Sequence, residues 1–242
     1  MDACLDKTEL LDYDSESIQK LIAAKGWKTL DEEGKIAAIY DFVQNEILFG
    51  YNEQDRMKAS AILRDGYGQC NTKTILMMAL LRAVDVSCRL HGFTVDKKVQ
   101  QGIMPGFVYK AAPDAIIHSW VEVFYHDKWI ELEGVILDMR YLKNLQGKFK
   151  STQGLFCGYG VADNNFQNPQ VEWKGTHTYI QKEAINHDYG TYNSPDAFFK
   201  KHPQKLNALQ EAAYQKVARP MMNQNVKRIR DLKYADQKTE TE

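Results

Sequence analysis

Three residues that lie far apart in the chain, Cys70, His118 and Glu133, have the side chains that nucleophilic acyl transfer requires. A cysteine thiolate can attack a carbonyl carbon, an imidazole can take the thiol proton, and a carboxylate can fix the tautomer of that imidazole. Cys70 follows Asp65-Gly66-Tyr67-Gly68, where two glycines in three positions predict a tight turn. The sequence therefore predicts a cysteine nucleophile with a histidine base, provided that the fold brings these residues together.

The element that must position Cys70 is a helix that begins at that residue. Residues 75–81 are apolar all round, which indicates a buried helix rather than a surface helix. At its first turn, unpaired backbone N–H groups and the positive end of the helix dipole stabilise a thiolate. We expect the backbone N–H of Cys70 to be the first donor to an oxyanion.

The pattern changes to strands after residue 85. Valine, isoleucine and aromatic residues predict strands at 87–95, 119–125 and 128–137. If the last two strands form a hairpin whose loop is centred on Tyr125-His126, His118 lies opposite Glu133. This register also divides the side chains between two faces, with Val121, Val123, Ile130 and Leu132 on one and His118, Trp120, Glu122, Glu131 and Glu133 on the other.

These motifs together resemble the transglutaminase-like superfamily of papain-like cysteine enzymes. The resemblance covers about residues 35–138 and rests on Gly66-Tyr67-Gly68-Gln69-Cys70, on His118-Ser119-Trp120-Val121-Glu122-Val123 and on the segment from Trp129 to Glu133. It implies that Cys70 is the nucleophile, His118 the base and Glu133 the third member of a triad. The aspartate and proline usual in the family are here Glu133-Gly134.

Four further residues are candidates for the substrate cleft. We expect Gln69 to shape the turn before Cys70 rather than to bind the oxyanion. Trp120 could wall the acyl or leaving-group side, although an aromatic side chain on a strand is as often simply packed. Asn45 and Tyr51 precede the site and could reach it. We also expect residues 96–117 and the carboxy-terminal extension to build the cleft.

Composition limits the other classes of function. The 31 basic and 32 acidic side chains of the 242 residues leave a formal charge of −1, so no global field favours nucleic acid or an anionic membrane. The cysteines at 4, 70, 88 and 157 are too few for a disulfide framework, and we expect Cys88 and Cys157 to be buried thiols. The remaining histidines lack metal-ligand spacing, so we predict no metal and no cofactor. Without a long apolar run, we expect a cytoplasmic protein.

The order of the predicted elements indicates an α+β fold of the papain-like, transglutaminase-like type, with the cysteine helix packed on an antiparallel sheet. Helices predicted at 15–25 and 31–48 would form an amino-terminal layer. We expect residues 1–147 to form the catalytic core and residues 148–242 to be an extension that packs on it without being an independent domain. Residues 148–193 are polar, and we expect them to be irregular.

The function that follows is cleavage of a peptide or isopeptide amide through a thioester, with hydrolysis as the expected outcome. Two alternatives remain open. An amine acceptor would make the protein a protein-glutamine transamidase, and the triad is common to both reactions. A non-catalytic binding module on the same fold is the alternative of another class. The expected partner is a peptide or protein amide substrate, not nucleic acid or a membrane.

Overall fold

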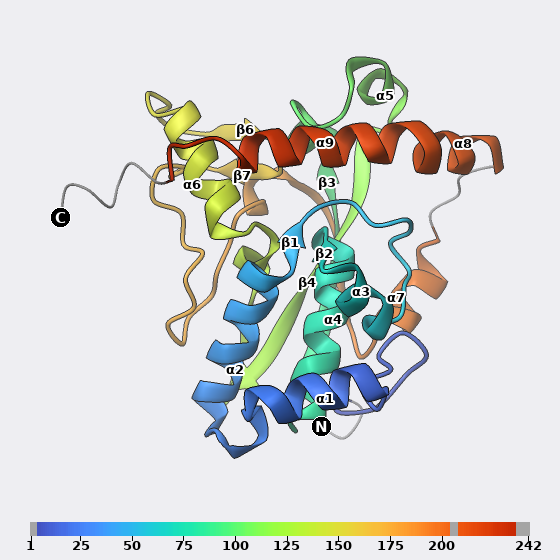
Figure 1. Ribbon diagram of the computed structural model, residues 1–242, viewed down its shortest axis with the longest axis vertical. Helices are drawn as coiled ribbons and strands as arrows, with labels where there is room; N and C mark the ends of the chain where they lie inside the picture. Colours follow the sequence, from blue (N-terminus) through green and yellow to red (C-terminus); the bar gives the residue numbers. More distant parts are fainter. Residues whose placement is uncertain (1–3, 204–207, 236–242) are drawn as a thin grey trace.

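A four-stranded antiparallel sheet with a buried helix against it forms the centre of the protein (Figure 1). The structure is a computed structural model that describes residues 4–203 and 208–235; residues 1–3, 204–207 and 236–242 lie outside the described part. The strand order is β5-β4-β3-β8. The strands are β3 (Cys88–Asp96), β4 (Ala115–Tyr125), β5 (Lys128–Glu131) and β8 (Ile185–Tyr192). The predicted α+β class is confirmed.

Helix α4 (Cys70–Ala83) begins at the predicted residue and is enclosed on all sides. Every residue from Asn71 to Ala83 is buried, as the apolar run at 75–81 requires. Leu90, Val121 and Val123 of the sheet belong to the same apolar cluster as this helix. The sheet and the amino-terminal helices together therefore fix the position and direction of α4.

The amino-terminal helices contact α4 and complete the main core (Figure 1). The second helix predicted from the sequence is shorter than expected, because it changes at Phe42 into a π-helical turn and ends at Glu46. The elements of this layer are α1 (Glu16–Lys25), η2 (Trp27–Thr29), α2 (Glu32–Asp41), η3 (Phe42–Glu46) and α3 (Ala59–Asp65).

The hairpin between β4 and β5 has a register different from the predicted one. Its two-residue loop is His126-Asp127, both with positive φ, and Glu122 pairs with Glu131. The predicted centre at Tyr125-His126 is therefore wrong by one residue. A shift of the centre by one residue moves the partner of each residue by two positions. The division of side chains between the two faces is therefore unchanged. The predicted strand at 128–137 is also too long, since η5 (Glu133–Ile136) follows β5.

The carboxy-terminal part is more regular than expected. Strand β8 adds to the sheet beside β3, although its sequence is largely polar and none of its side chains is fully buried. The other elements after residue 138 are α6 (Met139–Lys148), β6 (Phe156–Gly158), β7 (Val161–Asp163), η6 (Lys182–Ala184), α7 (Pro195–Lys201), α8 (Ala208–Ala213), η7 (Tyr214–Ala218) and α9 (Arg219–Arg230). No helix in the described residues is both long and apolar enough to cross a membrane.

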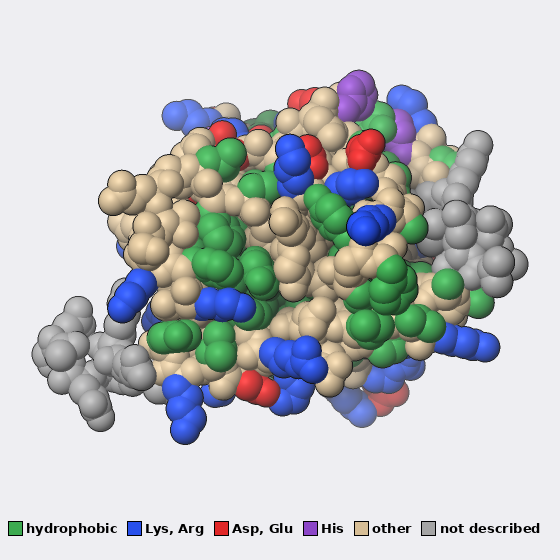
Figure 2. Space-filling model, turned by 90° about the horizontal axis from the view of Figure 1, so that it is seen from above, with side chains coloured by type: hydrophobic (Ala, Val, Ile, Leu, Met, Phe, Trp, Pro, Cys, Tyr) green, Lys and Arg blue, Asp and Glu red, His purple; other side chains and the backbone are tan. Residues whose placement is uncertain are grey.

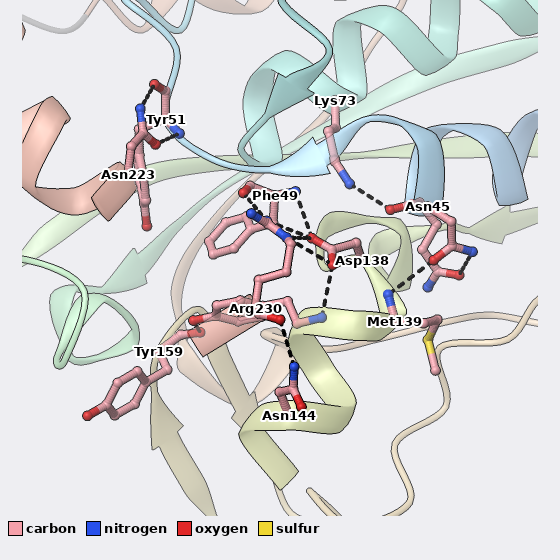
Figure 3. Close-up of polar contacts among 12 residues, drawn as sticks. Asn45, Phe49, Tyr51, Lys73, Asp138, Met139, Asn144, Tyr159, Asn223 and Arg230 are labelled. Atoms are coloured by element: carbon pink, nitrogen blue, oxygen red, sulfur yellow. Dashed lines mark hydrogen bonds and ion pairs between the residues drawn. The ribbon is translucent and has the colours of Figure 1, made fainter. Parts of the chain in front are cut away.

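We call residues 208–230, which comprise α8, η7 and α9, the C-terminal arm. The arm runs across the end of the molecule that holds β1 (Leu48–Phe49), β2 (Tyr67–Gly68) and the start of α4 (Figure 1). Side chains of the arm bond to backbone groups of the core: Asn223 pairs with both N–H and C=O of Tyr51, and Asn225 donates to the Ile103 carbonyl. Arg230 forms an ion pair with Asp138 (Figure 3).

The connection between β3 and β4 is partly helical. It contains η4 (Lys97–Gln100) and α5 (Gly106–Ala111), and β4 begins earlier than expected, at Ala115. Ile103 of this connection shares an apolar cluster with Met222 and Val226 of the C-terminal arm. These two parts of the chain therefore pack together near the start of α4.

Candidate active site

Cys70 occupies the first residue of α4, immediately after a turn fixed by close packing. Gly68 lies so near the helix that a Cβ atom there would stand 2.7 Å from Thr72 Oγ1. The Gln69 backbone N–H donates to Thr72 Oγ1 at 3.0 Å and forms part of the cap of the helix. The Cys70 side chain is partly exposed, as a thiol that meets a substrate must be.

His118 and Glu133 meet in the interior of the protein. His118 Nε2 lies 2.9 Å from Glu133 Oε1, and both side chains are fully buried. The contact does not arise from the predicted strand register, because Glu133 stands in the 3₁₀ turn η5 beyond the end of β5. In the observed register an extended strand would place Glu133 opposite Trp120, two positions short of His118, and the turn η5 instead brings the carboxylate to the histidine.

The other ring nitrogen of His118 is available for Cys70. Among the described residues Nδ1 has no hydrogen-bond partner, and Nε2 is already bonded to Glu133. Burial alone would lower the pKa of His118. The nearby Cys70 side chain, together with the hydrogen bond and charge of Glu133, outweighs burial and raises the pKa of His118 to about 10. The arrangement therefore favours the protonated form of His118.

The second oxygen of Glu133 is held by the chain beyond residue 147. Glu133 Oε2 accepts hydrogen bonds from the backbone N–H groups of Ile180 at 3.0 Å and Gln181 at 3.1 Å. The Glu133 backbone N–H donates to the Thr178 carbonyl, and Thr178 Oγ1 accepts from the next N–H, that of Gly134. Sequence reasoning missed residues 178–181, because backbone donors leave no signal in the side chains.

Gly134 accounts for the departure from aspartate and proline at this point. A Cβ atom at Gly134 would lie 2.6 Å from the Tyr40 hydroxyl and 2.9 Å from both Thr178 Cβ and Val171 Cα. No larger residue, proline included, fits at this position without movement of the backbone. The glycine allows the turn to lie against Thr178, and the longer side chain of Glu133 reaches His118 from there.

Comparisons with known proteins bear on this fold and site. A family model described as the transglutaminase-like superfamily matches residues 22–134, the part of the chain that carries Cys70, His118 and Glu133. Residues 22–134 form a transglutaminase-like superfamily domain. No curated protein matches the sequence of this chain.

One solved structure is similar over part of the chain. It is a crystal structure of a candidate cysteine protease from Cytophaga hutchinsonii, with 20% sequence identity and a TM-score of 0.40. The similarity covers 53% of this chain and 39% of that chain. The matched part is thus about two fifths of the length of the other protein.

Within the transglutaminase-like domain, the side chain of Gln69 has a structural role. Its Oε1 accepts from the Asn52 backbone N–H at 3.0 Å, and its Nε2 donates to Asp55 at 2.7 Å. These bonds tie the turn before Cys70 to residues 52–55. The side chain is therefore engaged in the turn, which is the role expected for it.

Trp120 packs beside the histidine of the transglutaminase-like domain. Its ring lies 5.8 Å from that of His118, measured between centroids and close to edge-on, and 4.0 Å from that of Phe93. The side chain is buried, with Nε1 unpaired in the described structure. Trp120 thus supports the ring of His118 from within the aromatic layer of the sheet.

Tyr51 and Asn45, the two residues expected near the site from the preceding segment, differ in position. Tyr51 lies near Cys70: burial raises the pKa of its phenol, and the charges of Tyr141 and Cys70 raise it further. Its hydroxyl bonds to Gln100 of the connection between β3 and β4. Asn45 points away toward α6, where its Oδ1 accepts from the Met139 N–H at 3.1 Å (Figure 3). The expectation that Asn45 reaches the site has no support in these contacts.

A residue that sequence reasoning did not single out, Tyr214 of the C-terminal arm, also lies near Cys70. Burial raises the pKa of Tyr214, and the charges of Asp55 and Cys70 add to this effect. Its hydroxyl donates to the Asn52 carbonyl at 3.1 Å. Cys70 and Tyr214 both pack against the apolar cluster that contains Ile103 and Met222. The surroundings of the thiol are therefore apolar and aromatic, and the arm supplies part of them.

The outer surface above the arm carries many basic side chains around apolar ones (Figure 2). Phe107 of α5 and Val217 and Met221 of the arm are exposed large apolar side chains. Two of the basic residues near the carboxy-terminal end are paired, Arg230 with Asp138 and Lys227 with Asp231. These two basic side chains are therefore neutralised by acidic side chains of the same chain.

One group of described residues has ligand atoms close enough together to hold a metal ion: His91, Glu122 and Glu131, within 4.8 Å of one another. Both nitrogens of His91 already bond to carboxylates, to Glu122 at 2.7 Å and to Asp188 at 2.9 Å. Burial lowers the pKa of His91, but these hydrogen bonds outweigh it and raise the pKa overall. When His91 is protonated, the form that the raised pKa favours, the group is an ion-pair network.

Two of the other cysteines differ in burial. Cys88 is buried as expected, and burial raises the pKa of its thiol to about 11. Cys157 is only partly buried, so the expectation of a buried thiol is wrong at that position. It lies in the short hairpin β6–β7 and packs against the edge of a small apolar cluster that contains Val99 and Ala162. All four cysteines are free thiols.

Proposed function

We propose that this protein is a cysteine peptidase or amidase that cleaves a peptide or isopeptide amide through a thioester on Cys70. Membership of residues 22–134 in the transglutaminase-like superfamily supports the general class. The observation that carries the proposal is His118, a buried imidazole with one nitrogen on Glu133 and the other free toward Cys70.

In the proposed reaction, His118 Nδ1 takes the thiol proton and Cys70 Sγ attacks the amide carbon. The backbone N–H of Cys70, at the first turn of α4, has no acceptor within the helix and can donate to the oxyanion. The imidazolium then gives its proton to the leaving amine, and the C–N bond breaks to leave a thioester. Water, deprotonated by His118, attacks the thioester and releases the acid and the thiol.

We further propose that the substrate lies between the connection from β3 to β4 and the C-terminal arm. Tyr51, Gln100 and Tyr214 support this location, because the two tyrosines lie near Cys70 and Gln100 bonds to Tyr51. Apolar and aromatic surroundings favour an uncharged acyl group next to the thiol. The two segments would then set specificity, while the triad sets the chemistry.

The test is turnover of a panel of fluorogenic peptide and isopeptide amides, with and without cadaverine as an amine acceptor. We expect hydrolysis by the wild-type protein and loss of turnover in both Cys70→Ala and His118→Ala, since members of a triad act as a unit. Preferential incorporation of cadaverine would instead identify a transamidase. Equal turnover in the wild-type protein and in Cys70→Ala would remove the proposal.

A further inference from the structure

Lys73 is a buried amine that the proposed reaction does not use. It stands one turn after Cys70 on α4, and its side chain is completely buried. Its Nζ donates to the Gln44 carbonyl and to the Val135 carbonyl, each at 3.1 Å. A lysine this deep in a core is rare and has to be matched by specific partners.

The two carbonyls that Lys73 binds belong to the turns that flank the site. Val135 lies in η5, two residues after Glu133, and Gln44 lies in the π-helical turn η3. The Gln44 side chain in turn donates to the Gly134 carbonyl at 3.0 Å. Two successive carbonyls of the turn that carries Glu133 are therefore held by buried side chains, one of which comes from the helix of Cys70.

The protonation state of Lys73 fits these two bonds. Burial lowers the pKa of Lys73 to about 7; the charge of Asp138 acts in the opposite direction, and that of Arg230 lowers it further. A neutral amine has two N–H donors, which is the number of carbonyls it binds. An apolar side chain could pack at this position without the cost of burying an amine. What Lys73 adds is therefore a pair of N–H donors, placed where they bind the two carbonyls.

We propose that Lys73 is a positioning residue that fixes the turn carrying Glu133 to the helix carrying Cys70. Through this link it sets the alignment of Glu133 on His118. The catalytic importance of Lys73 rests on the proposed function. Its effect on the geometry of the Cys70–His118–Glu133 group can be measured without a substrate.

The experiment is the rate of Cys70 alkylation by iodoacetamide from pH 5 to pH 10, read by peptide mapping, in Lys73→Met. With the turn released, Glu133 holds His118 less well and the imidazolium that stabilises the thiolate is weakened. We expect the alkylation profile to move to higher pH by about one unit, which lowers the rate at pH 6 about tenfold. An unchanged profile in folded Lys73→Met would overturn the proposal.

Arg82→Met is the matched control. Arg82 is a buried cation at the opposite end of α4, and it too donates to backbone carbonyls, including that of Cys88 at 2.9 Å. Its loss should destabilise the protein without moving the profile of Cys70. An equal shift in Arg82→Met would mean that general loss of stability is responsible, and it would contradict the role of Lys73.

Gln44→Met separates geometry from charge and serves if Lys73→Met does not fold. Charged or titratable groups that act on His118 are Cys70 and Glu133, and those that act on Lys73 are Asp138 and Arg230. Gln44 is uncharged, so its loss releases the same turn without an electrostatic change. We expect the same direction of shift, and a wild-type profile in Gln44→Met would overturn the proposal. Absence of amide turnover, with these shifts present, would count only against the proposed function.

Discussion

The carboxylate of Glu133 bonds to His118 at 2.9 Å although the strand before it ends two residues earlier, at Glu131. The turn η5 makes this contact possible, and the backbone N–H groups of Ile180 and Gln181 hold the second carboxylate oxygen. The orientation of His118 thus depends on a turn and on a segment outside the matched family domain.

This geometry predicts that glutamine at position 133 is more damaging than alanine. The N–H groups of Ile180 and Gln181 require an oxygen at one end of the side chain, so the NH₂ of glutamine would face His118 Nε2. That nitrogen would have to become an acceptor, which places the proton on Nδ1 and prevents it from taking the thiol proton. We expect Glu133→Gln to lower kcat by roughly 10²–10⁴-fold.

Glu133→Ala should retain more activity than Glu133→Gln, because it leaves the tautomer of His118 free to change. Glu131→Gln is the control, since Glu131 bonds to Tyr179 and contacts His177 rather than His118. Steady-state kinetics of the three variants decide the matter. Greater damage from Glu131→Gln than from either change at 133 would contradict the assignment.

Stability should depend on pH through two groups of opposite sign. The pKa of His118 is raised from 6.5 to about 10, so its stabilising contribution is complete below pH 6.5 and is lost as the pH rises toward 10. The pKa of Lys73 is lowered from 10.5 to about 7, so its contribution grows as the pH rises from 7 toward 10.5. The two trends partly cancel in the wild-type protein.

Variants should reveal each trend separately. Between pH 7 and pH 9.5, we expect the free energy of unfolding to fall with pH in Lys73→Met and to rise in His118→Phe, each relative to the wild-type protein. Urea denaturation at the two pH values measures both slopes. Parallel slopes in all three proteins would show that neither group has the protonation behaviour described.

The ion pair between Arg230 and Asp138 should be a main attachment of the C-terminal arm. Both side chains are largely buried, and Arg230 also donates to the Phe49 carbonyl at 2.5 Å. Because removal of one partner leaves a buried charge, Arg230→Met should lower the free energy of unfolding by about 3–5 kcal/mol. Lys227→Met, which breaks an exposed pair on the same helix, should have little effect by the same urea measurement.

The difference in free energy of unfolding between the wild-type protein and Arg230→Met should also depend on pH. Burial raises the pKa of Asp138, but the hydrogen bond and charge of Arg230, with the N–H groups of Phe49 and Tyr141, outweigh it and lower the pKa from 3.8. The contribution of Asp138 is therefore present above pH 3.8 and is lost as the pH falls through the lowered pKa. A gap between wild type and Arg230→Met that widens in acid would contradict this.

Tyr214 should affect substrate binding more than chemistry. Tyr214→Ala removes an aromatic wall near Cys70, and we expect KM to rise roughly tenfold with a smaller change in kcat. Tyr214→Phe, which loses only the bond to the Asn52 carbonyl, should be close to wild type. Val217→Ala, at an exposed position of the same arm, is the control. Similar KM values for Tyr214→Ala and Val217→Ala would show that Tyr214 of the arm does not contribute to substrate binding.

The parts of the fold that follow from side-chain patterns were predictable from the sequence. The apolar run after Cys70 requires a buried helix, and α4 begins at the predicted residue. The alternation of β4 places His118 and Trp120 on one face and Val121 and Val123 on the other, which survives the error in register because that error is an even number of positions. The fold class followed from these elements.

Features that rest on backbone groups or on distant polar pairs were not predictable. Strand β8 is largely polar and none of its side chains is fully buried, so it lacks the alternation that marks a strand. The N–H groups of Ile180 and Gln181 carry no side-chain signal, and η5 interrupts a sequence rich in residues that favour strands. The pairing of Arg230 with Asp138 joins residues 92 positions apart, which no local pattern indicates.

The central claim is that Cys70 forms a thioester during amide cleavage, and intact-protein mass spectrometry of the acyl-enzyme tests it most directly. The protein is mixed with a tryptic digest of casein, quenched in acid after milliseconds to minutes, and mapped with and without hydroxylamine, which cleaves thioesters. We predict a hydroxylamine-sensitive acyl adduct on Cys70 that is missing in Cys70→Ala and strongly reduced in His118→Ala. Cleavage of the peptides by Cys70→Ala at the wild-type rate, or an adduct on Cys4, Cys88 or Cys157 instead, would contradict the account.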